Sequence, residues 1–271
     1  MSQKQPVYFI PHGGGPWHVM EGSTRFGGWS DLRSFLETVQ GELPEKPKAI
    51  LAVTAHWDDV GTVTVSTAER PGMLYDYHGF PPHTYQIKYP APGAPQIAEH
   101  VRKVLSDAGI PTEADSQRGY DHGTFVPLMV AFPEAEIPVV QMSIRRDLDP
   151  AFHIALGRAL APLRDEGILI VGSGLSYHNM RMFGSTDPGH VDQARAFDAW
   201  LKDTLETSDM AERDSRLTHW WDNPAARACH FPTPEHFLPV MVAAGAGGDV
   251  AGHQVFQGIV LEKPYSGYRW G

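Results

Sequence analysis

Three histidines lie just past the ends of predicted β-strands, where side chains from separate parts of a chain can act together. They are His12, His56 and His178, and each follows a short run of apolar and β-branched residues. If these strands are parallel neighbours, their carboxyl ends meet at one edge of the sheet, where ligands bind in open α/β folds. We therefore expect the three imidazoles to converge on one site.

Two further histidines are candidates for the same site. His236 follows Thr233 and Pro234, which suit the N-cap and first position of a helix, so its side chain should project from a first helical turn. His122 lies in a loop ahead of another helical stretch. Imidazole is a common metal ligand and also titrates near neutral pH, so such a group could bind a metal and move protons.

Three protein ligands with open positions are typical of a catalytic metal centre. Imidazoles suit zinc, iron, copper and nickel, so the residues alone do not name the metal. Asp58 and His56 form the His-x-Asp start of a two-histidine, one-carboxylate iron triad, but that triad is usually carried by a β-barrel. Because strands alternate with helices in this chain, we place Asp58 in a loop near the site.

Other catalytic motifs are incomplete in this sequence. The segment His12-Gly13-Gly14-Gly15 is similar to the oxyanion segment of lipases, but the Gly-x-Ser-x-Gly turn that carries their nucleophile is missing. A phosphate-binding loop and a full dinucleotide fingerprint are missing as well. The sequence therefore disfavours a serine hydrolase and an enzyme that depends on NAD or ATP.

The elements that must position these residues alternate along the chain, which is typical of an α/β fold. We expect one domain over residues 1–271, with a central, mostly parallel or mixed sheet flanked by helices. A proline-rich stretch at residues 69–95 should form an ordered loop over the site. The expected strands, most of them buried and central, are residues 7–10, 49–54, 62–66, 138–143, 168–172 and 256–262. The expected helices are residues 29–40, 94–108, 150–164, 191–207 and 235–244.

Composition limits the partners and the compartment. The 271 residues include 32 acidic and 22 basic side chains, for a formal charge of −10, which is unsuited to nucleic acid or an anionic membrane surface. No apolar run approaches the roughly 18 residues of a membrane span. Cys229 is the single cysteine, so an internal disulfide is excluded, and without a recognisable secretion signal we expect a cytoplasmic protein. The oligomeric state is not predicted.

The motifs around the histidines occur in an order that resembles the class III extradiol ring-cleavage dioxygenases, with the DOPA-4,5-dioxygenase branch as the nearest likeness. Each motif alone is short, but the ordered set spans almost the whole chain. The segments are Pro11-His12-Gly13-Gly14-Gly15-Pro16, Thr54-Ala55-His56-Trp57, Tyr75-Asp76-Tyr77-His78-Gly79-Phe80-Pro81, Asp121-His122-Gly123, Gly172-Ser173-Gly174 with His178-Asn179, and Pro234-Glu235-His236-Phe237-Leu238-Pro239.

The resemblance implies a metal set of His12, His56 and His236. Fe(II) is the metal that it favours, with Zn(II) as a bound or replacing metal. Many members of the class use a glutamate as the third ligand, and Glu235 stands beside His236. The choice between Glu235 and His236 therefore stays open from the sequence.

The resemblance also implies an activity and its catalytic residues. The enzyme would insert O₂ into a catechol next to the diol and give a semialdehyde acid, with DOPA or another para-substituted catechol, such as a caffeoyl-type compound, as substrate. His178 falls on the general acid/base position and His122 on a second active-site histidine. The residues expected to bind the substrate ring are Trp17, Tyr75, Tyr77 and Tyr120. A zinc-dependent hydrolase with the same histidines and a non-catalytic metal-binding relative are the alternatives.

Overall fold

An eight-stranded mixed sheet organises the chain in this computed structural model, which describes residues 3–20 and 28–271. Its strands are β1 (Val7–Pro11), β2 (Ala49–Thr54), β3 (Val63–Ser66), β4 (Thr112–Asp115), β5 (Val139–Met142), β6 (Ile168–Gly174), β9 (His253–Val260) and β10 (Lys263–Trp270). They are ordered β4-β3-β5-β2-β6-β1-β10-β9. A separate two-stranded sheet joins β7 (His178–Asn179) to β8 (His230–Phe231).

The centre of the large sheet consists of four parallel strands, β5, β2, β6 and β1. Every residue of these four strands is buried. Continuous apolar burial is expected where helices cover both faces of a parallel sheet. The carboxyl ends of β1, β2 and β6 therefore lie side by side at one edge.

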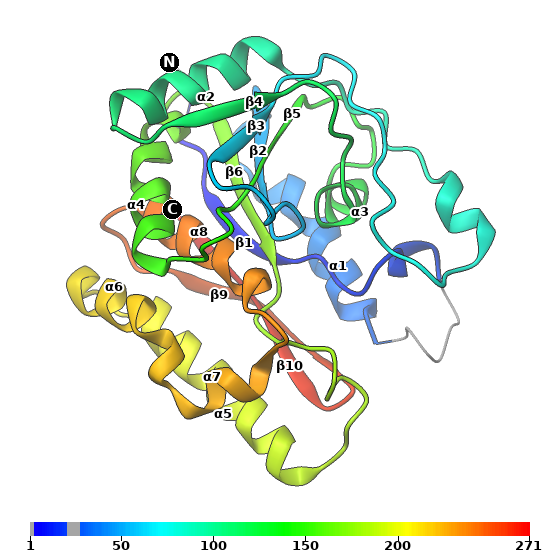
Figure 1. Cartoon of the computed structure of the whole chain (residues 1–271), viewed down its shortest axis with the longest axis vertical. Coiled ribbons are helices and arrows are strands. Elements are labelled where there is room, and N and C mark those ends of the chain that lie inside the picture. The colour runs from blue at the N-terminus through cyan, green and yellow to red at the C-terminus, as the bar shows by residue number, and fades with distance from the viewer. Residues whose placement is uncertain (1–2, 21–27) are drawn as a thin grey trace.

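Helices cover the sheet on both sides (Figure 1). They are α1 (Ser30–Val39), α2 (Pro95–Asp107), α3 (His122–Ala131), α4 (Pro150–Leu160), α5 (Pro188–Leu205), α6 (Met210–Thr218), α7 (Pro224–Cys229) and α8 (Leu238–Gly247). The fully buried α8 packs on β6 and β1, and α4 packs on α8, while α3 contacts β2 and β6 beside α1. Short 3₁₀ turns include η1 (Trp17–Val19), η2 (Gln40–Glu42), η3 (Pro82–Gln86), η4 (Ala161–Arg164), η5 (Trp220–Asp222) and η6 (Glu235–Phe237).

The predicted fold class is confirmed, and each predicted strand and helix has a counterpart in the structure. The strand expected at residues 256–262 is β9, which lies at the sheet edge because β10 lies between β9 and β1. One detail of those predictions is wrong. The helix expected at residue 235 begins as the 3₁₀ turn η6, with Pro234 at the N-cap position and no side-chain cap, so Thr233 does not cap it.

Several elements were not predicted, among them β4, β10, α6 and α7, whereas α3 is the helical stretch expected near His122. His122 is the first residue of α3 rather than part of a loop before a helix. The proline-rich stretch is an ordered loop as expected, held by the 3₁₀ turn η3 and by backbone pairing of Leu74 with Tyr120. Within the described ranges, no helix combines the length and the apolar character needed to cross a membrane.

Candidate metal centre and active site

Three histidines converge at the carboxyl edge of the parallel strands, as the strand order predicts. His12 follows β1 directly, and His56 lies two residues beyond β2. His236 reaches the same edge from η6, which is tied to the end of β6 because the Leu175 amide donates to the His236 carbonyl at 2.8 Å. Their ring centroids are 4.7 to 5.1 Å apart, and one nitrogen of each ring lies within 4.8 Å of those of the other two.

Each of these rings turns Nδ1 toward an oxygen atom of the protein. Nδ1 of His12 donates to the Gly13 carbonyl at 2.8 Å, and Nδ1 of His236 lies 2.7 Å from Glu235 Oε1. Nδ1 of His56 lies 3.2 Å from Asp76 Oδ2. An oxygen acceptor at Nδ1 favours the tautomer whose Nε2 lone pair is free, which is the usual arrangement of metal-binding histidines.

The three Nε2 atoms form a donor set that fits a divalent cation. His12 Nε2 is buried and lacks a hydrogen-bond partner among the described residues. The Nε2 atoms of His56 and His236 are 3.2 Å apart, which suits two nitrogens that each lie about 2.1 Å from one ion. Burial first, and then the charges of neighbouring histidines, hold the pKa of all three imidazoles well below its usual value. The rings are therefore neutral at pH 7, as metal ligation requires.

His122 lies beside this donor set, with its ring centroid 3.9 Å from that of His56. Its Nδ1 lies 2.8 Å from Asp76 Oδ1, and its backbone amide donates to the same oxygen at 3.0 Å. Burial opposes the charge on Asp76, but the hydrogen bonds and charge of His122 outweigh it and lower the Asp76 pKa. An ionised carboxylate only accepts, so the imidazole of His122 must donate through Nδ1.

The N-terminus of α3 fixes His122. Asp121 caps the helix by accepting the Thr124 amide at 3.0 Å, and its carboxylate also accepts the Thr54 hydroxyl at 2.9 Å. The backbone of Gly123 lies close to His56. A Cβ built on Gly123 would lie 2.6 Å from Thr54 Oγ1 and 2.8 Å from His56 Cδ2. Glycine is therefore required for α3 to approach the end of β2 this closely.

His178 stands on the other side of His236. The two rings stack with centroids 3.5 Å apart, and His178 Nδ1 lies 3.6 Å from Glu235 Oε1. Strand β7 carries His178 and pairs in parallel with β8, which places His178 opposite His230. Burial, and then the charge of His122, lower the pKa of His178 to about 4.

The four aromatic residues expected to bind substrate lie in different surroundings. The Tyr77 ring is 5.7 Å from that of His122, and its hydroxyl donates to the Thr84 carbonyl. Trp17 donates to the His12 carbonyl, and Tyr75 donates to the Ile87 carbonyl within the proline-rich loop. Tyr120 is instead a core residue by its contacts, since its hydroxyl faces three backbone carbonyls, those of Ala91, Pro92 and Val139.

Two carboxylates of the site had no orienting role in the sequence analysis. Asp76 occurs in a motif quoted there, and Glu235 was considered only as a metal ligand, yet each lies between two histidines of the cluster. The signal that could have found them is general, because metal-binding histidines usually pair their second nitrogen with a carboxylate or carbonyl. Asp58 lies in the loop after β2, as expected.

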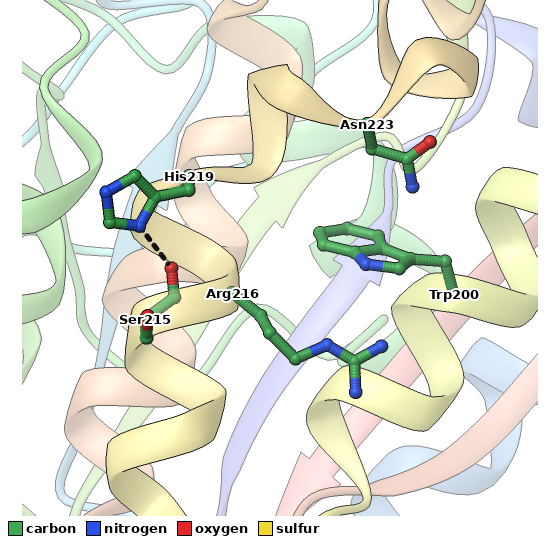
Figure 2. Close-up of a pocket in the computed structure, with 5 residues that line it drawn as sticks. All are labelled: Trp200, Ser215, Arg216, His219 and Asn223. Carbon is green, nitrogen blue, oxygen red and sulfur yellow. Dashed lines mark hydrogen bonds between the residues drawn. The ribbon is translucent and has the colours of Figure 1, made fainter.

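A surface pocket lies away from the histidine cluster, between α5, α6 and η5 (Figure 2). It is lined by Trp200, Ser215, Arg216, His219 and Asn223. Arg216 pairs there with Asp203 at 2.7 Å, and His219 Nδ1 bonds to the Ser215 carbonyl. Arg216 and His219 of this pocket therefore already have partners. The clustered histidines lie at the sheet edge instead.

Comparison with known proteins agrees with this geometry. The family described as the catalytic LigB subunit of aromatic ring-opening dioxygenase matches residues 6–262. The chain belongs to the LigB family. A 4,5-DOPA dioxygenase extradiol of Beta vulgaris is 39% identical over 245 residues, covering 90% of this chain and 87% of that protein. A protein of the same name from Escherichia coli K12 is 36% identical over 249 residues, covering 90% and 86% of the two chains.

A solved structure supports the fold of this LigB-family chain. An uncharacterised Escherichia coli K12 protein superposes with a TM-score of 0.77 and 32% identity, covering 99% of this chain and all of that one. Together, the family match and the relatives make this LigB-family protein an extradiol ring-cleaving dioxygenase. They disfavour the hydrolase and the non-catalytic relative.

Proposed function

We propose that this LigB-family enzyme holds Fe(II) with His12, His56 and His236 and cleaves a para-substituted catechol next to its diol. The observation that carries the proposal is the convergence of three neutral imidazoles whose Nδ1 atoms all face oxygens. His236 is the third ligand in this proposal, because its ring nitrogen joins those of His12 and His56. Glu235 then serves as its hydrogen-bond partner.

Fe(II) is preferred over Zn(II) because of the reaction. When bound, the iron supplies positive charge for a catecholate and a redox-active centre for O₂, whereas zinc has no redox chemistry. Three histidines leave the site without a ligand carboxylate, which favours an anionic substrate. Both atoms of O₂ enter the ring-opened product, so no reductant is needed.

His178 is the general acid/base in this proposal. Its lowered pKa of about 4 keeps the ring unprotonated near neutral pH, so it can accept a proton from a catechol hydroxyl. The same nitrogen can return that proton as the ring opens. Stacking on His236 places His178 against the residues that would hold the metal and therefore beside the reacting diol.

His122 has a different role, because its Nδ1 is committed to Asp76. The nitrogen that remains is Nε2, whose lone pair can accept a hydrogen bond from a substrate hydroxyl. His122 would thus orient the diol, while His178 exchanges the proton.

The proline-rich loop would select the substituent of the catechol. Tyr75 and Tyr77 direct their hydroxyls to loop carbonyls, so they offer ring faces to the substrate. Trp17 supports the backbone of His12 and is a further candidate wall. DOPA and caffeoyl-type compounds both fit this class of para-substituted catechol, and the core contacts of Tyr120 make it the weakest member of the set.

We also infer the context of the enzyme from the same observations. Residues 1–271 act as one catalytic domain, and the partners are the catechol and O₂ rather than nucleic acid or a membrane. We expect a cytoplasmic location, where the buried thiol of Cys229 stays reduced.

An anaerobic reconstitution experiment tests this function. The purified chain is loaded with Fe(II) or with Zn(II) and then given O₂ with DOPA, caffeic acid or unsubstituted catechol. The proposal predicts stoichiometric O₂ uptake and the absorbance of a ring-opened semialdehyde with Fe(II) and a para-substituted catechol. Absence of uptake with every catechol, or uptake that follows zinc and ignores iron, would overturn it.

A further inference from the structure

Asp76 links two histidines of different function with one side chain. Oδ1 lies 2.8 Å from His122 Nδ1 and accepts the His122 backbone amide at 3.0 Å, while Oδ2 lies 3.2 Å from His56 Nδ1. His56 belongs to the proposed metal set, and His122 is proposed to meet the substrate. The carboxylate therefore lies behind the point where metal and substrate would come together.

We propose that Asp76 is a positioning residue that fixes both the orientation and the tautomer of His56 and His122. This inference rests on the proposed function for the roles of the two histidines, but the contacts themselves do not depend on it. With a proton held on Nδ1 of each ring, both Nε2 atoms present lone pairs toward the site. One carboxylate would then prepare a metal ligand and a substrate contact together.

A carboxylate suits this task better than another polar side chain. It has two oxygens that only accept when ionised, so it can face two imidazole N–H groups at once. The amide of asparagine could accept from one ring but would present its NH₂ group to the other. The charge is also favourable at this place, because His122 is the first residue of α3 and a helix N-terminus stabilises an anion.

The second carboxylate of the site, Glu235, contacts its two neighbouring histidines unequally. Glu235 lies 2.7 Å from His236 Nδ1 but 3.6 Å from His178 Nδ1, and that nitrogen of His178 lacks a hydrogen-bond partner among the described residues. Asp76 thus fixes Nδ1 of His122, whereas Glu235 leaves Nδ1 of His178 without a hydrogen bond. This difference agrees with a fixed orienting role for His122.

The position of Asp76 in the chain connects the support of the histidines with the proposed substrate pocket. It belongs to the proline-rich loop, between Tyr75 and Tyr77, whose hydroxyls are bonded to carbonyls of the same loop. The loop therefore contributes both a proposed wall of the substrate pocket and the support of His56 and His122. Removing the Asp76 carboxylate should disturb metal binding and substrate orientation together.

Long-range ¹⁵N–¹H NMR of the full chain labelled at histidine tests the tautomers directly. Zn(II) is the added metal, because it is diamagnetic and leaves the imidazole signals visible. In the wild-type protein we expect His122 to carry its proton on Nδ1. Asp76→Asn and Asp76→Ala should convert His122 to a mixture of tautomers or to the Nε2–H form. A wild-type His122 with its proton on Nε2 would overturn the inference, whether or not the enzyme cleaves catechols.

Metal titration and kinetics test the second half of the inference with the same variants. We expect Asp76→Ala to weaken Fe(II) binding by roughly 10- to 100-fold, the range typical for loss of a hydrogen-bond partner of a metal ligand. At saturating Fe(II) its kcat should still be at least about tenfold below wild type, because His122 remains unsupported. Wild-type affinity, or wild-type kcat once iron is saturating, would contradict the proposal.

Asp107→Asn is the matched control, since Asp107 is an exposed carboxylate that pairs with Lys103 on α2. It should match wild type within about twofold in affinity and kcat. Asp76→Asn nearly preserves the shape of the side chain, so near-ultraviolet circular dichroism can show that it folds even if Asp76→Ala does not. If wild type itself cleaves no catechol, the proposed function fails, while the tautomer and affinity measurements still decide the role of Asp76.

Discussion

The imidazole rings of His178 and His236 are stacked, with centroids 3.5 Å apart and planes at 17° to one another. They come from segments far apart in the chain, β7 after the central strand β6 and η6 before α8. Because both segments reach the same sheet edge, the proposed proton carrier lies directly against a proposed metal ligand. Glu235 stands beside both rings.

The choice of third metal ligand can be tested by paired substitutions. His236→Ala should abolish Fe(II) binding, because it removes a nitrogen from the donor set. Glu235→Gln should retain iron with roughly 10- to 100-fold weaker affinity, since the amide oxygen can still accept from His236 Nδ1. Iron content and titration of the two proteins measure this. Loss of iron in Glu235→Gln alone would make Glu235 the ligand.

If His178 is the general acid/base and not a metal ligand, its loss should lower turnover without affecting metal binding. His178→Ala should keep wild-type iron content and lose about 10²- to 10⁴-fold in kcat, the usual contribution of a positioned acid or base. The reason is that Nε2 atoms of other residues make up the proposed ligand set. Oxygen uptake at saturating Fe(II) measures the effect, and a His178→Ala protein with full activity would refute the assignment.

Gly123→Ala should damage the site through sterics alone. The new Cβ would lie 2.8 Å from His56 Cδ2 and 2.6 Å from Thr54 Oγ1, so the His56 ring or α3 must shift. We expect weaker iron binding and at least about tenfold lower kcat, because small misplacements at a site are costly. Gly41→Ala is the control, since a Cβ there meets nothing within 4 Å. Equal behaviour of the two variants would contradict the geometry.

A buried histidine outside the site predicts how stability changes with pH. Burial lowers the pKa of His153 to about 4 from an ordinary value of 6.5. Its Nδ1–H donates to the Asp149 carbonyl in either protonation state, but its Nε2 accepts the Arg145 amide, and this second bond requires the neutral ring. The unfolded chain therefore binds the proton more readily. Stability is complete above pH 6.5 and falls by about 3 kcal/mol from this group as the pH drops to 4.

Denaturant unfolding at pH 7 and pH 4.5 measures whether the free energy of unfolding falls in acid as expected. His153→Gln should lose less stability between the two pH values than wild type does, while His253→Gln, at an exposed position, should behave as wild type. An identical loss in His153→Gln and wild type would show that His153 does not titrate as described.

The convergence of three histidines could be predicted from the sequence, because one general rule says where the ends of neighbouring parallel strands lie. His12, His56 and His178 follow β1, β2 and β6, and parallel neighbours must present their carboxyl ends together. Asp76 could not be placed in this way, because it reaches His122 from a loop 46 positions earlier in the chain. No periodicity links a loop carboxylate to a distant helix N-terminus.

The differences between the expected and the observed elements have identifiable reasons. The helical stretch expected after His122 was given no bounds, because α3 is buried on nearly all sides and contains Pro127, and so lacks the one-sided apolar pattern that predicts a surface helix. Strand β10 includes Pro264 and Gly267, which are unusual in strands. Tertiary contacts override these preferences, since the buried Ser266 hydroxyl bonds to Asp198 at 2.5 Å.

We propose above all that three imidazoles from separate segments bind one iron ion. Crystals of the Fe(II)-loaded chain, measured on both sides of the iron absorption edge, test it most directly. We predict one anomalous peak about 2 Å from the Nε2 atoms of His12, His56 and His236. A peak bound elsewhere, or the absence of iron from this cluster in protein that cleaves catechols, would contradict the account.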